Sequence, residues 1–269
     1  MKIEKRNLAG KRVLVTGASR GLGALIARAF AEQRAELVLA ARDREKLEGV
    51  ARDCERLGAR VTPEAVDLAD SRAREALVSR AGRFDVLVNN AGVEATRRLL
   101  DQSDDEVRAQ LELNLTAPIA LIRALLPDMI ARHSGAIVNV SSMSGKAATP
   151  FNSIYAATKH GLNGLTTSLA AELHGTGVHV GVVCPSYVAE AGMWSDSGLR
   201  APRMLREVAP EKVVRAVFRV RAGEVEVLVT PGPMRPLLAL RELIPSIEAP
   251  MLRAMGIARV MQARADRDR

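Results

Sequence analysis

Short apolar runs alternate with longer amphipathic segments along almost the whole chain. Seven runs, most of them rich in Val, Ile, Leu and Ala, are predicted as strands at residues 12–16, 36–40, 60–66, 84–88, 136–140, 178–183 and 225–230. The segments between them repeat apolar positions with helical periodicity. Strands that alternate with helices favour a parallel sheet, and runs that are apolar at consecutive positions suit strands buried on both faces. We therefore predict an α/β fold with a doubly wound, parallel, seven-stranded sheet.

The length and composition suit a single domain followed by a C-terminal addition. With 269 residues, 48% of them hydrophobic, the chain can bury a sizeable core in one domain. We expect this domain to span residues 1–233, with a lid over the substrate site at about 190–210. Two apolar helical segments, 237–244 and 250–261, follow the Pro-rich stretch 230–236. Residues 234–269 are therefore expected to form a helical extension packed on the same domain.

The extension has three interpretations that the sequence leaves open. It covers the entrance of the site, joins an interface between subunits, or rests on an anionic membrane surface. Packing on the protein is favoured over membrane contact, because prolines interrupt the apolar face. Residues 1–11 are polar and charged, and no later run approaches about 18 consecutive apolar residues. This pattern predicts a cytoplasmic protein.

The charge and the metal-ligating residues exclude several function classes. The net charge is +8, but the arginines are spread along the chain and aromatic residues make up only 3%. Because stacking platforms are scarce, we expect no nucleic-acid partner, and the excess charge suits anionic small molecules instead. Cys54 and Cys184 are far apart, and the four histidines show no ligand spacing. No disulfide and no metal site are expected.

Glycines lie at a predicted turn between a strand and a helix. Gly17, Gly21 and Gly23 follow the strand at 12–16 directly, and an apolar helical pattern begins at Ala24. Glycines at such a turn let backbone amides approach a phosphate, while the amino end of the helix supplies free N–H groups and a favourable dipole. The segment therefore predicts a phosphate-binding loop, although a turn without a ligand has the same local pattern.

Tyr155 and Lys159 are four residues apart in a segment with helical periodicity. A helix places them on one face, where the ammonium favours the phenolate and brings the phenol closer to useful acidity. The pair is therefore a candidate proton donor with its activating cation. A contact on the protein surface is the competing interpretation of this spacing.

These segments together resemble the short-chain dehydrogenase/reductase family, in its compact single-domain branch. The matching segments follow the family's order: Thr16-Gly-Ala-Ser-Arg-Gly-Leu-Gly23, Asp67-Leu68, Asn89-Asn-Ala-Gly92, Asn114, Ser142 and Tyr155-Ala-Ala-Thr-Lys159. The interval of 13 residues between Ser142 and Tyr155 is also the family's usual spacing. The resemblance covers most of the chain. It implies a Rossmann fold with three α/β/α layers and an oxidoreductase that interconverts a carbonyl and a secondary alcohol.

The resemblance also implies a role for each matching residue. Tyr155 donates a proton to the substrate oxygen, which Ser142 positions. Lys159 favours the tyrosinate and holds the nicotinamide ribose, and Asn114 organises a water relay. The implied cofactor-binding residues are Gly17, Ser19, Arg20, Gly21, Leu22, Gly23, Arg42, Asp67, Leu68, Asn90, Ala91, Gly92, Tyr155, Lys159 and Val188.

The end of the second predicted strand favours NADP(H). Ala41 stands where an acid grips the adenosine ribose of NAD. Arg42 follows it, and Arg20 lies in the glycine loop, so that two guanidinium groups can converge on a ribose 2′-phosphate. The alternative is that Arg42 pairs with Asp43 or Glu45 and that Asp43 restores binding of NAD(H).

The segment after the sixth predicted strand departs from the family pattern. The family has Pro-Gly-x-Val-x-Thr, whereas this chain has Pro185-Ser-Tyr-Val-Ala-Glu190. Ser186 replaces a glycine beside the nicotinamide, and Glu190 is expected to place negative charge near the pyrophosphate. The departure leaves open a regulatory or interaction protein that binds NADP(H) without turnover. The intact set of Asn114, Ser142, Tyr155 and Lys159 argues against that alternative.

The predicted lid is apolar and indicates the substrate class. It contains Met193, Trp194, Leu199, Met204 and Leu205. A hydrophobic pocket with one polar reacting centre suits an aliphatic, steroid-like or acyl carbonyl, although sugars and polyols remain candidates. The same residues also suit a lid that merely packs on the core.

A homodimer or homotetramer is implied by the resemblance. In this family the helix that carries the catalytic tyrosine typically packs against its symmetry mate. Small residues on the corresponding segment, Ala156, Ala157, Gly161 and Gly164, permit such close approach.

Overall fold

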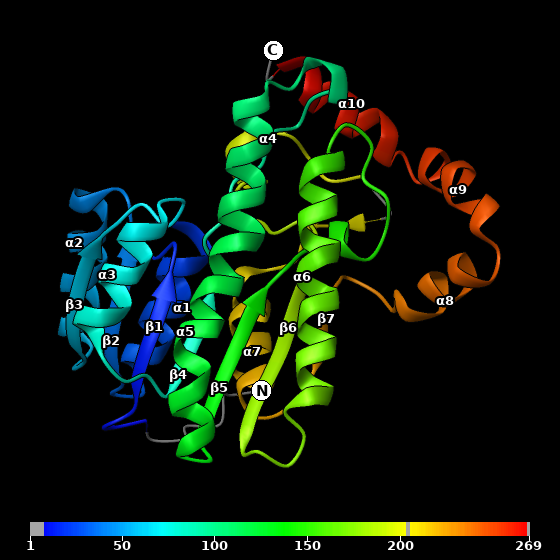
Figure 1. Ribbon diagram of the computed structural model, residues 1–269. Coiled ribbons are helices and arrows are strands. Elements are labelled where there is room, and N and C mark those ends of the chain that lie inside the picture. Colours follow the sequence, from blue (N-terminus) through cyan, green and yellow to red (C-terminus); the bar gives the residue numbers. More distant parts are fainter. Residues whose placement is uncertain (1–7, 203–204, 268–269) are drawn as a thin grey trace.

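A seven-stranded parallel sheet forms the centre of the molecule (Figure 1). The computed structural model describes residues 8–202 and 205–267. The strand order is β3 (Arg60–Ala65), β2 (Glu36–Ala41), β1 (Arg12–Thr16), β4 (Val86–Asn89), β5 (Gly135–Val140), β6 (Val178–Pro185) and β7 (Glu226–Val229). Every neighbouring pair in this order is parallel. The predicted fold class is confirmed, and the predicted strand ends differ from those observed by at most two residues.

Helices cover both faces of this sheet and bury a separate core on each. One face carries α1 (Gly21–Ala31), α2 (Arg44–Arg56) and α7 (Pro210–Arg221). The other carries α3 (Ser71–Ala81), α5 (Ala117–Ala131) and α6 (Ser153–Glu172). Val13 and Val15 of β1 enter the first core and Leu14 enters the second. Because successive side chains of a strand point to opposite faces, apolar residues at consecutive positions fill both cores.

A long helix passes over the second core and carries Asn114. It consists of α4 (Asp104–Leu111), the π-helical segment η2 (Glu112–Thr116) and α5 without interruption. Within the described residues, Asp104–Ala131 is the one helix long and apolar enough to cross a membrane, with a mean hydropathy of 1.4 in its apolar window. Leu121, Leu125 and Met129 are buried against the sheet. These contacts make the helix part of the layered fold.

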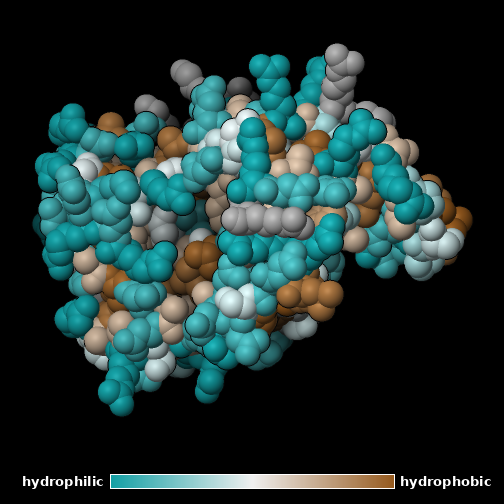
Figure 2. Space-filling model, turned by 90° about the horizontal axis from the view of Figure 1, so that it is seen from above, coloured by the Kyte–Doolittle hydropathy of each residue, from teal (hydrophilic) through white to brown (hydrophobic). Residues whose placement is uncertain are grey.

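The described residues after β7 form α8 (Arg235–Leu243), α9 (Glu248–Ala254) and α10 (Ile257–Arg267). Figure 1 shows α8 and α9 to one side of the sheet and α10 returning above the carboxyl ends of the strands. In the view from above, hydrophobic side chains lie in a central hollow and on the protruding extension (Figure 2). Leu243 at the end of α8 is 80% exposed.

The extension packs with the segment predicted as a lid. Leu252, Ile257 and Met261 form a small third core with Leu205. Within the described part of the extension, α8 itself has no buried residue. Met204, another apolar residue of the predicted lid, lies outside the described residues. The apolar contacts of the extension with the domain are thus made through α9 and α10, whereas α8 is attached by the polar contacts of Arg235 with Glu226 and of Arg241 with Lys146.

A chain of buried hydrogen bonds ties α6 to the middle of the sheet. The side chain of Asn89 donates to Oδ1 of Asn139 at 2.8 Å, and Nδ2 of Asn139 donates to Oγ1 of Thr166 at 2.9 Å. Thr166 in turn donates to the carbonyl oxygen of Leu162 at 2.6 Å. Because Asn139 and Thr166 are fully buried, water cannot replace these bonds. The chain therefore fixes the position of α6 relative to β4 and β5.

Replacing the last hydroxyl of this chain should destabilise the protein. We expect Thr166→Val to lower the free energy of unfolding by about 1–3 kcal/mol, because the amide of Asn139 loses its acceptor without a change of side-chain shape. Thr167→Val is the matched control, since Thr167 is the exposed next residue of α6, and we expect a change within about 0.5 kcal/mol. Urea unfolding of both variants measures the difference, and equal effects would contradict this role for Thr166.

Candidate active site at the carboxyl edge of the sheet

The loop after β1 brings backbone atoms close to neighbouring segments. Gly17 has a φ of 66°, and a Cβ there would lie 2.8 Å from Cα of Ala91. A Cβ on Gly23 would lie 2.1 Å from the carbonyl oxygen of Gly17. Both positions exclude a side chain, and the loop leads into the amino end of α1, where anions bind. The remaining predicted residues of the loop, Ser19, Arg20, Gly21 and Leu22, line the same cavity.

Thr16 holds the segment after β4 beside the glycine loop. Its hydroxyl donates to the carbonyl oxygen of Val88 at 3.2 Å. Oγ1 of Thr16 also accepts from the backbone N–H groups of Asn90 at 2.9 Å and Ala91 at 3.0 Å. The side chain of Asn90 donates back to the carbonyl oxygen of Thr16 at 3.0 Å. These bonds unite two of the predicted motifs in one wall of the cavity.

Asn114 holds the next residues of that wall. Its Oδ1 accepts from the backbone N–H of Val93 at 2.8 Å, and its Nδ2 donates to the carbonyl oxygen of Val93 at 2.8 Å. Nδ2 also donates to Oγ1 of Thr158 at 3.3 Å. A Cβ on Gly92 would lie 3.1 Å from Oδ1 of Asn114. The fully buried amide thus connects the segment after β4 to α6.

Tyr155 and Lys159 lie close together on α6, with 6% and 3% of their surfaces exposed. Nζ of Lys159 lies 5.5 Å from the centre of the Tyr155 ring and donates to the carbonyl oxygen of Val140 at 3.0 Å. Burial lowers the pKa of Lys159 to about 8. Burial raises the pKa of Tyr155, and the Glu94 carboxylate raises it further. At neutral pH the site therefore holds a protonated phenol beside an ammonium.

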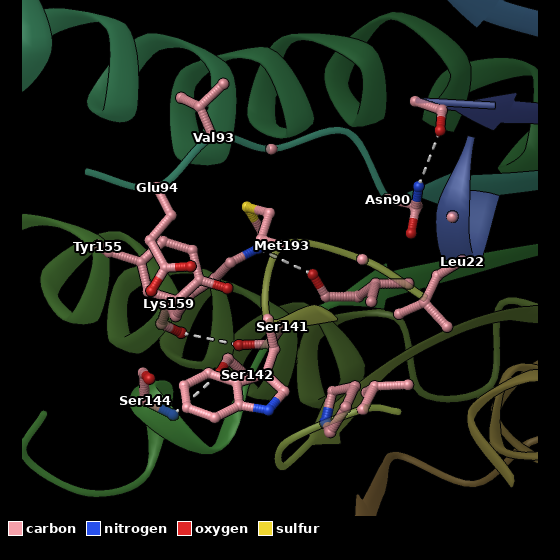
Figure 3. Close-up of a pocket in the computed structure, with 18 of the residues that line it drawn as sticks. Leu22, Asn90, Val93, Glu94, Ser141, Ser142, Ser144, Tyr155, Lys159 and Met193 are labelled. Carbon is pink, nitrogen blue, oxygen red and sulfur yellow. Dashed lines mark hydrogen bonds between the residues drawn. The ribbon is translucent and has the colours of Figure 1, made fainter. Parts of the chain in front are cut away.

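Ser142 follows β5 and faces the same space as these two side chains (Figure 3). Its hydroxyl accepts from the backbone N–H of Ser144 at 3.1 Å. A hydrogen bond between Ser142 and Tyr155 lowers the pKa of the phenol, against the effect of burial. Two hydroxyl groups held in this way can both donate to one carbonyl oxygen.

Two cations face the cavity beyond the end of β2, one directly after the strand and one in the first turn of α2. Arg42 is exposed and lines the cavity together with Lys46. Asp43 caps α2, since its carboxylate accepts from the backbone N–H of Lys46 at 3.1 Å and pairs with Nζ of Lys46 at 2.7 Å. The acid considered as a ligand for the ribose of NAD is therefore engaged by Lys46, and among the described residues neither Asp43 nor Glu45 forms an ion pair with Arg42.

Two other predicted cofactor residues have partners within the protein. Arg20 pairs with Asp196 of the predicted lid, and both side chains are more than half exposed. Oδ1 of Asp67 accepts from the backbone N–H of Ala69 at 3.0 Å. Asp67 and Leu68 nevertheless line the cavity beside the end of β2.

The two residues after β6 that depart from the family pattern, Ser186 and Glu190, lie in different surroundings. Ser186 lines the cavity, and its hydroxyl is buried with no hydrogen-bond partner among the described residues. Val188 is 5% exposed, lines the cavity and forms a β-bridge with Val208. Glu190, with a φ of 57°, is exposed and is not among the lining residues. The Glu190 side chain therefore does not line the cavity, and the expectation that its charge lies near the pyrophosphate stays a prediction.

Two charged residues of the site were not singled out from the sequence. Glu94 and Arg264 line the cavity and form an ion pair at 2.9 Å. Glu94 follows the Asn89-Asn-Ala-Gly92 motif closely, which is a usable signal. Arg264 carries no such signal, because its partner is 170 residues away in the sequence.

These residues surround one cavity of about 510 Å³ that runs from Arg42 past the glycine loop to Tyr155 and Ser142. This volume is typical of a ligand site. The glycine loop has no space for a Cβ at Gly17 or Gly23. Cations lie at one end of the cavity and a proton donor lies at the other. The residues therefore fit an elongated, phosphorylated cofactor such as a nicotinamide dinucleotide.

Comparison with known proteins agrees with this geometry. The family profile for short chain dehydrogenases matches residues 11–200, from the start of β1 to beyond Val188. The chain belongs to the short-chain dehydrogenase/reductase family. As a member it is an oxidoreductase that acts on CH–OH and C=O groups, which confirms the resemblance and the enzyme class predicted from the sequence.

Relatives of this dehydrogenase/reductase include the ketoacyl reductase HetN of Nostoc sp., 37% identical over 269 residues that cover 96% of this chain and 94% of the relative. A metagenomic short-chain oxidoreductase solved in complex with NADP is 37% identical, with a TM-score of 0.71 over 85% of this chain and 100% of that chain. A 3-oxoacyl-[acyl-carrier protein] reductase from Brucella melitensis with bound NAD is 31% identical, with a TM-score of 0.72 over 82% of this chain and 91% of that chain.

The buried ammonium of Lys159 should give this dehydrogenase/reductase a characteristic pH dependence of stability. Its pKa is about 8 in the folded protein and 10.5 ordinarily. Between these pH values the unfolded chain holds a proton at Lys159 that the folded protein has released, so the contribution of Lys159 to stability rises with pH across this window. The rise amounts to about 3 kcal/mol.

Lys159→Met should remove this rise, because no proton is then exchanged at position 159. Urea unfolding at unit steps from about pH 7 to 10 measures the effect, and parallel profiles for the two proteins would contradict it. Cys54 and Cys184, whose pKa values burial raises from the ordinary 9.0, give the opposite slope above about pH 9, and Tyr155 gives it above 10.0. The difference between the two proteins therefore isolates the contribution of Lys159, because these groups are present in both.

Proposed function

We propose that the protein is an NADP(H)-dependent oxidoreductase that interconverts a carbonyl and a secondary alcohol on a hydrophobic substrate. The observation that carries this proposal is the position of Tyr155, buried beside Lys159 and Ser142 in the cavity that also contains the glycine loop. A proton donor, a cation and a second hydroxyl thus face one reacting centre.

In this proposal Tyr155 donates its proton to the substrate oxygen during reduction, and Ser142 donates a second hydrogen bond that positions the same oxygen. A nicotinamide held in the cavity by the glycine loop would supply the hydride for reduction or accept it for oxidation. Lys159 lies 5.5 Å from the phenol ring, and its positive charge stabilises the tyrosinate left after proton transfer. The buried amide of Asn114 holds the wall on which the water relay would be built.

Tyr155→Phe should abolish most turnover and spare cofactor binding. We expect kcat to fall by about 10²- to 10⁴-fold, because the ring remains but the proton donor is lost. NADPH affinity, measured by fluorescence titration, should change by less than about threefold. Tyr187→Phe is the matched control, since Tyr187 is the only other tyrosine in the chain and also lines the cavity. Similar turnover in both variants would refute the role of Tyr155.

The preference for NADP(H) rests on the residues at the end of β2. Ala41 presents no carboxylate, Arg42 and Lys46 line the cavity, and Asp43 is bound by Lys46. Two cations near this end favour a 2′-phosphate over a ribose diol. The metagenomic relative was solved with NADP, whereas the Brucella relative was solved with NAD. NAD(H) is therefore the alternative cofactor to test.

Arg42→Asp should weaken NADPH binding by at least about tenfold, because a charge-assisted contact is lost and a repulsion is introduced. NADH binding should change by less than about threefold, since NADH has no 2′-phosphate. Arg44→Asp is the matched control, because Arg44 is exposed, pairs with Glu48 and is not among the cavity-lining residues. Titration with both cofactors checks this, and equal losses for NADPH and NADH would contradict the assignment.

The substrate end of the cavity supports a hydrophobic substrate. Its walls include Met193, Trp194, Leu205, Leu252, Ile257 and Met261. HetN is named a ketoacyl reductase and the Brucella relative a 3-oxoacyl-[acyl-carrier protein] reductase. β-Ketoacyl thioesters are therefore the first substrates to assay with NADPH, followed by hydrophobic ketones, steroids and sugars.

A second candidate function is a protein that binds NADP(H) without turnover. The observation that favours it is Ser186, whose buried hydroxyl has no partner among the described residues and stands where the family pattern has a glycine. Binding of NADPH with no consumption across the substrate panel would support this alternative. Turnover that Tyr155→Phe removes would exclude it.

We also propose that the protein forms a homodimer or homotetramer through α6. Ala157 and Gly164 are exposed on this helix and leave room for close approach of a second copy. Sedimentation of the parent chain and of Gly164→Arg would test this, since a large cation at such an interface should dissociate the oligomer.

A further inference from the structure

A buried ion pair joins the C-terminal helix to the segment that follows β4. The guanidinium of Arg264 donates from Nη1 to Oε1 of Glu94 at 3.0 Å and from Nη2 to Oε2 at 2.9 Å. Each side chain is only 9% exposed. The ion pair is bidentate and largely shielded from solvent, which makes the contact both strong and directional.

Neighbouring elements contact the same pair. The side chain of Asn152, just before α6, donates to Oε1 of Glu94. Arg264 donates to the carbonyl oxygen of Met193 at 3.3 Å, and its guanidinium carbon lies 5.9 Å from the centre of the Trp194 ring. Figure 3 shows Glu94 and Met193 beside Tyr155 and Lys159. The ion pair therefore joins α10, the predicted lid and the start of α6 at the substrate end of the cavity.

The other end of the extension is attached to the segment after Ser142. The carboxylate of Glu248 accepts from the backbone N–H of Ala148 at 2.8 Å and pairs with Arg241 at 3.4 Å. Arg241 also donates to the carbonyl oxygen of Lys146. Between these two attachments, Leu252, Ile257 and Met261 line the cavity. The extension thus spans the substrate end and is fixed on both sides of it.

We propose that Glu94 and Arg264 are positioning residues that dock α10 as the outer wall of the substrate pocket, and that this wall determines which hydrophobic substrates are accepted. The inference rests on the proposed function, because it concerns the substrate of the same site. A long acyl or similarly extended apolar substrate contacts the wall, whereas a short one reacts at Tyr155 without reaching it.

The chemistry of the pair explains why α10 remains docked. Removing one partner would leave the other charge buried and uncompensated, which is unfavourable enough to release the helix. Replacing both by neutral side chains removes the charge from both sides and leaves the apolar contacts of α10 and the hydrogen bond from Arg267 to the carbonyl oxygen of Ser197 at 3.1 Å. The Glu94–Arg264 pair therefore fixes the position of α10 together with these contacts.

Docking also affects the proton donor. The groups that act on Tyr155 are Glu94 after β4, Ser142 after β5, Cys184 on β6 and Arg264 on α10, with Lys159 next to it on α6. Glu94 raises the pKa of the phenol and Arg264 lowers it. When α10 is displaced, the Glu94 carboxylate is no longer balanced by Arg264. Loss of Arg264 should then shift the pH profile of alcohol oxidation to higher pH, which a purely structural role would not do.

Tryptophan fluorescence measures docking without any need for activity. Trp194 is the only tryptophan of the chain, is 7% exposed and lies beside Arg264. In Arg264→Met we expect acrylamide quenching of Trp194 to increase by at least about twofold, because the helix that covers it opens. Arg259→Met is the matched control, since Arg259 is an exposed residue of the same helix, and its quenching should equal that of the parent chain.

Kinetics with two substrates tests the specificity. With NADPH, Arg264→Met and Glu94→Gln should each raise KM for a twelve-carbon β-ketoacyl thioester by at least about tenfold. KM for a four-carbon thioester should change by less than about threefold. Arg264→Lys keeps the charge but loses the bidentate contact, so its effect should be smaller than that of Arg264→Met. The double variant Glu94→Gln/Arg264→Met should be no worse than the worse single variant, because the two residues act as one pair.

Several outcomes would overturn the proposal. It is wrong if Trp194 quenching in Arg264→Met matches the parent chain, or if KM rises equally for short and long substrates. It is also wrong if the single effects add fully in the double variant. If Arg264→Met does not fold, the quenching of Trp194 is measured in Arg264→Lys and in the double variant instead. Values equal to that of the parent chain in both would then overturn the proposal. Absence of NADPH consumption by the parent chain would refute the proposed function instead, and the quenching comparison would still measure docking.

Discussion

The chemistry of the site depends on keeping an ammonium buried beside a phenol at the carboxyl edge of a parallel sheet. Lys159 is almost fully buried, which lowers its pKa to about 8 and still leaves it charged at neutral pH. A charge in such a place is tolerated only when its surroundings are polar and fixed. The carbonyl of Val140, at the end of β5, accepts from this ammonium. The contact ties α6 to the end of β5 at the site itself.

Buried hydrogen bonds around Tyr155 and Lys159 hold the helix that carries them in position. The chain from Asn89 through Asn139 to Thr166 holds α6 against the sheet. Asn114, in a π-helical turn, connects the same helix to the segment after β4. Such π-helical turns often occur at functional sites, since the extra residue turns a side chain inward. The buried hydrogen bonds therefore serve the geometry of the site as well as stability.

The C-terminal extension supplies the walls of the substrate end of the cavity, which the sheet does not. A parallel sheet offers a cofactor crevice at its carboxyl edge, but it leaves the substrate end open. Here α9 and α10 close that end with apolar side chains, and Arg264 brings a cation to within hydrogen-bonding distance of Glu94. The cofactor end has exposed cations and the substrate end has apolar walls, so the two ends of one cavity suit two different kinds of molecule.

The sequence by itself determined the features that depend on near neighbours in the chain. Apolar periodicity located the strands, the glycine spacing located the loop after β1, and the interval from Tyr155 to Lys159 placed both side chains on one helix face. Only the tertiary structure decided which distant residues meet. It joined Glu94 to Arg264 and Arg20 to Asp196, it turned Asp43 toward Lys46, and it kept Glu190 outside the cavity. The physical reason is that periodicity follows from local backbone geometry, whereas an ion pair between remote segments follows from how complete elements pack.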